Sequence, residues 1–403
     1  MNVWIANPFD NLPPEGARPQ RYWLMARAFA RAGHRVTLWS SDFSHARKAP
    51  RALAPGARWE GDGFRLVLVP TPPYPRNVCL RRIRSHRAFA RNLRTLAELD
   101  PQRPDLVVAS LPPLASASAL ADFCRARGIA FVVDVMDAWP ENFERVVPRW
   151  LLAPLRAKAR RIYRSAQGVS AVAARYIELA QSYGAQAPAH LAYHGIELPA
   201  NASRQVRPVL TKNEGVFRLA YAGTMGASYD LETAIDAVRE MPDVELDLAG
   251  SGPKEAALRA RAEGCARIRF HGYLGEGELR ALLAQADAGL VPMFDDSCVG
   301  VPYKLADYAA EGLPVVNTLH GETERLLAEH GAGVTCAAGD VRALCAAVAD
   351  LRARDAAALR AGALSLARRF DAETVYSGYV AWAQEIARNE KNLILPLPNR
   401  GAL

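Results

Sequence analysis

Short apolar runs alternate with longer amphipathic stretches along the whole chain. The runs are rich in Val, Leu and Ala, as in 105–110 (DLVVAS) and 244–250 (VELDLAG). Such runs are typical of strands buried on both faces of a parallel sheet, and the stretches between them are typical of crossover helices. The pattern predicts parallel α/β architecture, with strands at 2–6, 35–40, 64–70, 105–110, 130–135, 168–173 and 190–195, then at 217–223, 244–250, 267–273, 288–293 and 313–318.

The predicted strands fall into two groups, separated by a segment without hydrophobic periodicity. That segment, 198–214, contains Pro, Asn and Ser and is predicted to be a linker. A chain of 403 residues also exceeds what one hydrophobic core usually contains. We therefore predict two doubly wound α/β domains, 1–197 and 215–370, with a cleft between them at the carboxyl ends of the strands. A helix over 371–390 is expected either to pack back on the first domain or to belong to the second.

The composition favours a protein of the reducing cytosol. The six cysteines are scattered without a C-x-x-C pair, which argues against a zinc site or a secreted disulfide framework. The first residues, MNVWIANPFDN, lack the basic head and apolar stretch of a signal peptide. No apolar run approaches the roughly 18 residues that a membrane-spanning helix needs.

Positive charge is concentrated in the first half of the chain. Residues 1–200 contain 28 Lys and Arg against 15 Asp and Glu, whereas residues 201–403 contain 22 against 27. Such asymmetry indicates an anionic partner, which is a lipid surface, a nucleic acid or a phosphorylated substrate. The basic half lacks the interleaved aromatic residues and reader motifs of nucleic-acid-binding proteins, so no nucleic-acid partner is expected.

The segment 79–99 combines apolar residues with many arginines. A basic amphipathic helix of this kind can lie on an anionic membrane, where each cation contributes about 1 kcal/mol. The alternative is a helix that faces the core and exposes its arginines to water. The charge excess favours the membrane, and a second basic run follows at 156–164. The arginines expected to meet the lipid are Arg81, Arg82, Arg84, Arg87 and Arg91.

Two glycine-containing loops follow predicted strands in the second half. One contains Gly223, Thr224 and Gly226, and the other contains Gly252 and Pro253. Small residues between a strand and a helix let backbone amides approach a phosphate. Neither loop is a complete G-x-G-x-x-G motif, and each by itself is also explained as a tight turn. Their combination predicts a phosphate site.

The segment 299–317 (VGVPYKLADYAAEGLPVVN) adds a short helix with Lys304 and Asp307 on one face. Pro302 suits the first turn of a helix, where free backbone amides favour an anion. Lys304 brings positive charge to the same end, and Asp307 can accept hydrogen bonds from the vicinal hydroxyls of a ribose. The segment is predicted to bind a nucleoside diphosphate. The alternative is an ordinary crossover helix with a surface Lys and Asp.

Taken together, these motifs resemble glycosyltransferase family 4, over nearly the whole chain. The resemblance implies the GT-B fold, which has two Rossmann-like domains, and retaining transfer of a sugar from a nucleoside diphosphate sugar without a metal or cofactor. It extends the expected donor-binding set to Tyr273, Gly300, Val301, Tyr303 and Leu305. The motifs that carry it are PYKLADYAAEGLPVV (302–316), GSGP (250–253), RFHGYL (269–274), ADAGLVPM (286–293) and RAGHRVTLW (31–39).

The chain departs from the family pattern at three places. Asp307 stands where the family normally has the Glu that binds the ribose, and Val299 stands where it has another Glu. The basic residues that usually follow the glycine loop are missing, and Lys304 is expected to supply that charge. In this the chain resembles the branch with a V-P-x-K-x-x-E-Y motif, which transfers N-acetylated or amino-deoxy sugars in bacterial surface polysaccharide assembly. The expected donor is a UDP-sugar.

The same resemblance suggests roles for two loops of the first domain. Glu15 and Gly16 stand where the family has a flexible glycine loop near the donor phosphate, and Arg18 follows within reach; a simple turn is the alternative. Asp137 and Glu141 belong to a D-x-W-P-E stretch, and either could orient the acceptor hydroxyl. Each could equally cap the next helix.

The leading hypothesis is therefore a retaining glycosyltransferase at the inner face of a bacterial membrane. Its acceptor is expected to be a saccharide carried on a polyprenyl diphosphate. A sugar-nucleotide epimerase of the same architecture is the closest alternative, and it would need no acceptor. A basic nucleic-acid-binding protein is an alternative of another class, which leaves the phosphate loops unexplained.

Overall fold

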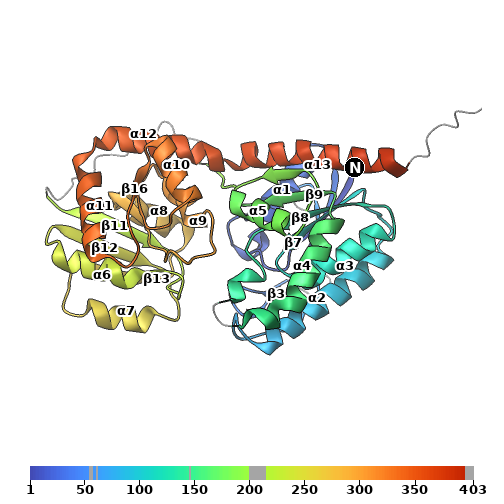
Figure 1. Cartoon of the computed structure of the whole chain (residues 1–403), viewed down its shortest axis with the longest axis horizontal. Helices are drawn as coiled ribbons and strands as arrows, with labels where there is room; N and C mark the ends of the chain where they lie inside the picture. Colours follow the sequence, from blue (N-terminus) through green and yellow to red (C-terminus); the bar gives the residue numbers. More distant parts are fainter. Residues whose placement is uncertain (54–57, 60–61, 145–146, 199–214, 395–403) are drawn as a thin grey trace, which may run out of the picture. The chain divides into compact units, whose positions relative to one another are not determined.

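The computed structural model describes residues 1–53, 58–59, 62–144, 147–198 and 215–394. The chain forms two compact units, whose elements are labelled in Figure 1. Unit 1 contains Met1–Gly195 together with the chain from Ala372 onward, and unit 2 is Ile196–Asp371. The predicted linker, 198–214, lies outside the described residues apart from Leu198.

Unit 1 is built on a sheet and a short hairpin. The strands of the sheet are β1 (Asn2–Ala6), β2 (Arg35–Ser41), β5 (Arg58–Trp59), β6 (Arg65–Val69), β7 (Leu106–Leu111), β8 (Ala130–Val135), β9 (Gly168–Ala171) and β10 (Ala189–Leu191), and the hairpin consists of β3 (Phe43–Ser44) and β4 (Ala49–Pro50). The sheet order is β10-β9-β8-β7-β1-β2-β6-β5. Only β5 runs antiparallel to its neighbour. Every residue of β7 and β8 is buried, as their apolar sequences predict.

Helices cover both faces of this sheet. The helices are α1 (Arg21–Arg31), α2 (Leu80–Leu99), α3 (Leu114–Arg125), α4 (Ala153–Ser165), α5 (Ala174–Ser182) and α13 (Ala372–Ile394), with short 3-10 turns η1 (Pro13–Glu15), η2 (Glu141–Phe143) and η3 (Arg149–Leu152). In Figure 1, α2, α3 and α4 form one layer, and α1 and α13 lie on the other side of the strands.

The last helix, α13, belongs to the core of unit 1. Tyr376 and Tyr379 are fully buried among the side chains of α1 and the central strands. Farther along α13, the Trp382 ring stacks on His190 at 5.2 Å between centroids. The hydroxyl of Tyr379 lies 3.1 Å from that of Ser170 on β9. A chain segment that follows unit 2 in sequence thus completes the hydrophobic core of unit 1.

Unit 2 also contains a parallel sheet covered by helices, and this sheet is smaller than that of unit 1. Its strands are β11 (Phe217–Ala222), β12 (Val244–Ala249), β13 (Ile268–Gly272), β14 (Ala288–Val291), β15 (Val315–Asn317) and β16 (Gly333–Thr335). They are all parallel and follow the order β13-β12-β11-β14-β15-β16. The order reverses between β11 and β14, which is the dinucleotide-fold arrangement. Two doubly wound parallel sheets confirm the predicted α/β class.

The helices of unit 2 pack in two groups. They are α6 (Leu231–Glu240), α7 (Glu255–Ala262), α8 (Glu276–Gln285), α9 (Tyr303–Ala310), α10 (Glu322–His330), α11 (Val341–Ala353), α12 (Ala356–Ala367) and the turn η4 (Arg368–Phe370). Helix α6 contacts α7 and α11, whereas α12 contacts α9 and α10. Asp230 caps α6 by accepting a hydrogen bond from the Thr233 amide at 3.2 Å. Across the described residues, no helix is long and apolar enough to cross a membrane.

Candidate functional site

The reversal of strand order in unit 2 sets the carboxyl ends of β11 and β14 side by side. In open parallel sheets, ligands bind outside the carboxyl ends of the strands at such a point. Gly223 directly follows β11, Gly250 follows β12 and Tyr273 follows β13. The segment 300–302 lies between β14 and α9. The predicted donor-binding residues of unit 2 therefore lie along one edge of one sheet.

Helix α9 is fixed to this edge by Tyr308, a residue that the sequence analysis missed. Its hydroxyl accepts a hydrogen bond from the Ala222 amide at 2.9 Å and donates one to the Leu290 carbonyl at 3.3 Å. One side chain thus joins β11 to β14. A Cβ on Gly289 would lie 2.5 Å from the Tyr308 ring, so glycine makes room for it. Leu305 is also fully buried, which locks the helix against the sheet.

Lys304 has an unusual environment. Its side chain is 6% exposed, and its Nζ lies 4.1 Å from the Tyr221 ring centroid and 3.7 Å from that of Tyr229. Among the residues that the structure describes, Nζ has no hydrogen-bond partner. Burial lowers the pKa of Lys304 well below its ordinary value, and the nearby charge of Asp307 opposes this shift. Aromatic faces compensate a buried cation only in part, so the site is short of negative charge.

The loops after β11 and β12 are joined backbone to backbone. The amide of Gly223 donates to the Ala249 carbonyl at 3.0 Å, and that of Met225 donates to Ser251 at 2.9 Å. A Cβ on Gly250 would lie 1.9 Å from the Gly223 carbonyl oxygen. Glycine is needed here so that two loops can touch. The Gly223 amide is therefore already bonded to the neighbouring strand, and the role expected for this loop in binding phosphate stays a prediction.

Gly223 serves the site in a different way. Its φ of 148° is one that other residues rarely adopt, and a Cβ there would lie 3.2 Å from the Nζ of Lys304. The missing side chain therefore leaves the space beside the ammonium open. Thr224 supports the same wall, because its carbonyl accepts the Tyr221 hydroxyl at 2.6 Å. Gly252 packs on the backbone of Met225, where a Cβ would lie 2.4 Å from the carbonyl oxygen.

The other predicted donor-binding residues occupy varied positions along this edge. Asp307 and Tyr303 are half-buried on α9, and Val301 is buried just before it. The Gly300 carbonyl accepts the hydroxyl of Thr323 at 2.9 Å, which anchors the loop that enters α9. Tyr273 is fully open to solvent. Gly226 lies in the loop after β11, and Pro253 lies just before α7.

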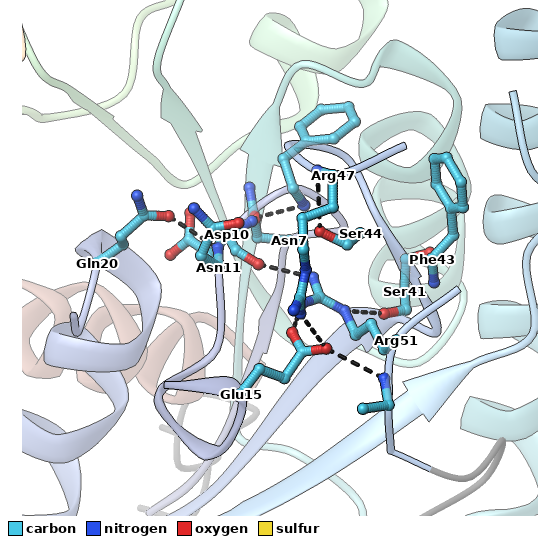
Figure 2. A network of polar contacts seen from close by, with 12 residues as sticks. Asn7, Asp10, Asn11, Glu15, Gln20, Ser41, Phe43, Ser44, Arg47 and Arg51 are labelled. Atoms are coloured by element: carbon cyan, nitrogen blue, oxygen red, sulfur yellow. Dashed lines mark hydrogen bonds and ion pairs between the residues drawn. The ribbon is translucent and has the colours of Figure 1, made fainter. Parts of the chain in front are cut away.

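In unit 1, Glu15 is used internally, as Figure 2 shows. Its carboxylate is buried and forms ion pairs with Arg51 at 2.6 Å and Arg47 at 2.5 Å. Gly16 ends the turn η1 with a left-handed φ of 76°. Arg18 is half-buried in the segment that leads to α1. The arrangement favours the simpler of the two expectations, in which Glu15 and Gly16 build a turn.

Asp137 and Glu141 follow β8 and are both bonded within unit 1. Asp137 accepts hydrogen bonds from the Ala138 amide at 3.0 Å and from the side chain of Asn142. Burial raises the pKa of Asp137. Glu141 accepts the hydroxyl of Tyr183. Asp137 thus holds the segment that enters η2, and Glu141 joins that turn to Tyr183. Neither side chain caps η2, so the capping alternative is not what the structure shows, and the acceptor-orienting role stays a prediction.

The arginines predicted to meet a membrane do not all point the same way. Arg81, Arg84, Arg87 and Arg91 are exposed along α2. Arg82 is half-buried, and its guanidinium carbon lies 5.4 Å from the centroid of the Trp139 ring. The helix also divides along its length, because Phe89 and Leu93 are buried whereas Leu80 and Ile83 are exposed.

A second buried cation, Arg21, was not singled out in the sequence. Its guanidinium donates two hydrogen bonds to Asp134, from Nε at 2.8 Å and from Nη2 at 2.7 Å. The carbonyls of Ala192 and Tyr193 accept from Nη1 at 2.8 and 3.0 Å. Asp134 also accepts the hydroxyl of Tyr22 at 2.7 Å. This network joins α1, β8 and the segment after β10 inside unit 1.

Family models match both units of the chain. Residues 19–193 match the model described as "Glycosyl transferase 4-like domain", and residues 217–354 match "Glycosyl transferases group 1". Among solved structures, sucrose-phosphate synthase from Thermosynechococcus elongatus has a TM-score of 0.72 at 14% identity, over 98% of this chain and 99% of that one. Anabaena Alr3699/HepE in complex with UDP and glucose has a TM-score of 0.67 at 15% identity, over 96% and 99%.

Curated relatives are similar over part of their length. Glycogen synthase of Mycobacterium tuberculosis is 34% identical over 173 residues, which cover 40% of this chain and 41% of that protein. The amylovoran biosynthesis glycosyltransferase AmsK of Erwinia amylovora is 29% identical over 164 residues, which cover 38% and 40%. The matched regions thus span well under half of each curated relative.

Two doubly wound units define the GT-B class of protein, in agreement with the solved structures. Within that class, glycosyltransferase models match each of the two units, which supports the resemblance to glycosyltransferase family 4 that the motifs predicted.

Proposed function

We propose that this chain transfers a sugar from a nucleoside diphosphate sugar, and that Lys304 binds the diphosphate. The observation that carries this proposal is the buried Nζ of Lys304, which has two tyrosine rings around it and, in the described chain, no hydrogen-bond partner. A buried cation is normally paired with an anion. A diphosphate beside Gly223 would provide that negative charge, and it would favour the protonated, positively charged form of the Lys304 amine.

The same geometry suits the chemistry of transfer. As the sugar leaves, negative charge grows on the diphosphate, and a fixed cation in a site of low dielectric stabilises that charge strongly. Asp307 lies one turn along α9 and would accept hydrogen bonds from the ribose hydroxyls. The solved structure of HepE with UDP and glucose supports a UDP-sugar as donor. Front-face transfer with retention would need no protein nucleophile, because the departing phosphate would take the acceptor's proton.

The proposal also covers the transferred sugar, the acceptor and the need for a metal ion. The V-P-x-K motif favours an N-acetylated or amino-deoxy hexose as the transferred sugar. The similarity to AmsK, an amylovoran biosynthesis glycosyltransferase, supports a role in bacterial polysaccharide synthesis, and we propose a lipid-linked saccharide as the acceptor. In the described part of the chain, no three His, Cys, Asp or Glu side chains are placed to bind a metal ion. Retention and independence from metal remain predictions.

We further propose that the protein acts at the inner face of the cytoplasmic membrane, and exposed apolar residues on unit 1 support this location. Leu80 is 83% exposed at the start of α2, just before the exposed arginines of that helix, and Trp150 is 74% exposed in η3. Both segments adjoin the loop after β8, because Arg82 of α2 packs over Trp139 and Arg149 of η3 pairs with Glu144 at 3.6 Å. Apolar side chains next to cations suit a membrane with anionic lipid.

A transfer assay tests the donor proposal. Purified protein is incubated with a panel of UDP-sugars, with and without bacterial lipid-linked saccharides, and free UDP is measured. Release of UDP that requires the acceptor supports transfer, whereas conversion of the donor sugar without any acceptor would support an epimerase. Failure of every nucleoside diphosphate sugar to bind would refute the proposal.

Sedimentation with vesicles tests the membrane proposal. The protein is expected to bind vesicles that contain phosphatidylglycerol and to bind pure phosphatidylcholine much less. The double variant Leu80→Asp, Trp150→Asp should lose this binding, whereas Leu99→Asp, an equally exposed apolar residue at the far end of α2, should keep it. Equal sedimentation of all three proteins would contradict the proposal.

A further inference from the structure

Unit 1 carries a second group of cations at the carboxyl edge of its sheet. We call it the cation–aromatic cluster, and its members come from five separate segments. Phe9 follows β1, the β3–β4 turn contributes His45 and Lys48, Tyr74 follows β6, α2 contributes Arg82, and Trp139 follows β8. Ligands of doubly wound sheets bind at this edge. The cluster thus occupies a ligand-binding position in unit 1 without a role so far.

Aromatic rings surround the guanidinium of Arg82. Its carbon lies 5.4 Å from the centroid of the Trp139 ring, 5.7 Å from that of Phe9 and 6.0 Å from that of Tyr74. It donates a hydrogen bond to the Asn77 carbonyl at 2.7 Å. Three rings around one guanidinium fix its position, and a fixed cation loses little freedom when it binds a ligand.

Lys48 approaches the same cluster from the β3–β4 turn. Its Nζ lies 5.3 Å from the centroid of the Tyr74 ring and donates to the carbonyl of His45. Lys48 has a positive φ of 55°, which residues other than glycine seldom adopt. The turn therefore holds this side chain toward Tyr74 at some cost in backbone energy, and such strain is typical of functional positions.

The positive charge of the cluster is not neutralised within the described residues. No carboxylate among them forms an ion pair with Lys48 or Arg82, whereas Glu15 pairs with both Arg47 and Arg51 close by. Burial, and then the charge of Arg82, lower the pKa of Lys48 to about 8. Burial, and then the charges of Lys48 and Arg82, lower the pKa of His45 to about 3, so that its ring is neutral.

The other charged and titratable groups near the cluster do not cancel this excess. Asp137 is the carboxylate whose field reaches Arg82, and burial raises the pKa of Asp137 itself. His86 is neutral, because burial and the charge of Arg82 lower its pKa to about 3. Cys79 is half-buried at the start of α2. The two cations together therefore favour an incoming anion.

We propose that the cation–aromatic cluster binds an oxyanion of the acceptor, with Arg82 and Lys48 on the charge and the ring of Trp139 against the adjoining apolar or sugar moiety. This inference rests on the proposed transfer function, and it names the chemistry of the acceptor. Guanidinium and ammonium groups are the usual partners of phosphate and carboxylate. Phe9, His45 and Trp139 are half-buried, so the cluster is partly open to solvent.

The neighbouring surface favours a phosphate as the source of the oxyanion. Leu80 and Ile83 are exposed on the same first turns of α2 that carry Arg82, and Val78 is exposed just before them. A lipid whose phosphate lies at Arg82 would therefore have exposed apolar side chains of the same helix end within the length of its hydrocarbon chain. An acidic sugar would offer the same oxyanion chemistry through a carboxylate, without using these apolar residues.

Tryptophan fluorescence provides a probe that is specific to this unit. All seven tryptophans of the sequence lie in unit 1, and Trp139 belongs to the cluster. Geranyl diphosphate and glucuronate are titrated into the full chain, with geraniol and glucose as uncharged controls. The variants are Arg82→Gln and Lys48→Gln, and the matched control is Arg94→Gln, an exposed arginine on the same helix. The affinity for UDP is measured for every protein.

Each outcome has a defined meaning. Geranyl diphosphate is expected to bind, with at least tenfold weaker binding for Arg82→Gln and Lys48→Gln and less than a twofold change for Arg94→Gln. The same pattern with glucuronate would support the site and identify an acidic sugar as the source. Equal binding by Arg82→Gln and wild type, or no binding of either anion, would overturn the inference. UDP binding is read separately, so failure of the donor proposal would be distinguished from failure of this one.

Discussion

Arg21 in unit 1 and Lys304 in unit 2 are both buried cations, and their surroundings are opposite. Arg21 is 1% exposed and forms hydrogen bonds to Asp134 and to two backbone carbonyls. Lys304 is 6% exposed and contacts the faces of Tyr221 and Tyr229, with no hydrogen bond to its Nζ in the described chain.

The effect on protonation is opposite as well. Burial disfavours the charged form of Arg21, but Asp134 outweighs it and the pKa of Arg21 is raised well above its ordinary value. Burial also disfavours the charged form of Lys304, and here it prevails, so that the pKa is lowered. A buried charge that is paired inside the fold serves stability, whereas one without a partner indicates a ligand.

The largest expected effect comes from breaking the paired cation. Arg21→Met leaves Asp134 buried without a counter-charge, so the free energy of unfolding of unit 1 should fall by about 3–5 kcal/mol. Tryptophan fluorescence in urea reports on this unit alone, because unit 2 contains no tryptophan. The control, Arg94→Met, removes an exposed ion pair with Glu98 and should cost less than about 1 kcal/mol. A loss no larger than the control would contradict the structural role.

In contrast to Arg21→Met, the variant Lys304→Met should lose ligand binding and keep its stability. Removing an unpaired buried charge should leave the melting temperature of unit 2 unchanged or higher, as measured by calorimetry. The Kd for UDP should rise about 100-fold, because the diphosphate loses its buried counter-charge. Arg259→Met, on the exposed surface of α7, is the charge-matched control. Unchanged UDP affinity, or a marked loss of stability, would show that Lys304 serves the fold instead.

The variant Asp307→Asn tests the contact to the ribose of UDP separately from the contacts to its diphosphate. The variant should bind UDP about tenfold more weakly, because neutral acceptors bond hydroxyls less strongly than a carboxylate does. It should bind inorganic pyrophosphate as the wild type does, whereas Lys304→Met should bind both ligands poorly. Equal losses for UDP and pyrophosphate in Asp307→Asn would remove Asp307 from the ribose.

The smallest expected effect is a transfer of protons. In the free protein the pKa of Lys304 is lowered by burial, and a bound diphosphate should raise it again. The protein should therefore take up at most about one proton for each UDP that binds. Its affinity for UDP should fall as the pH rises. Calorimetric titrations at pH 8 in Tris and in Hepes measure this uptake. Lys304→Met should show none, and equal uptake by both proteins would assign the proton to another group.

Much of the fold and part of the candidate site could be predicted from local pattern. Buried parallel strands need continuous apolar runs, so β7 and β8 are visible in the sequence. Pro302 and Lys304 are visible because helix starts and their charges are set by neighbouring residues. The phosphate contact expected at the loop of Gly223 stays a prediction, and only the structure shows that the Gly223 amide itself is bonded to Ala249 on the neighbouring strand.

Partners that lie far apart in sequence escaped prediction. Arg21 and Asp134 are separated by 113 positions, and the Ala222 amide and the Tyr308 hydroxyl by 86. Nothing in local periodicity pairs such residues. Glu15 shows the same limit, since its glycine neighbour suggested a ligand loop, while its carboxylate is bonded to Arg51, 36 residues away.

The sequence by itself determined the two sheets, their order of elements and the short helix that carries Lys304 and Asp307, because periodicity, turn residues and helix ends are local properties. Only the tertiary structure decided which buried charges are paired. Whether a cation meets a carboxylate or an aromatic ring depends on which strands become neighbours, and burial then makes that difference large enough to separate a residue of the fold from a residue of the site.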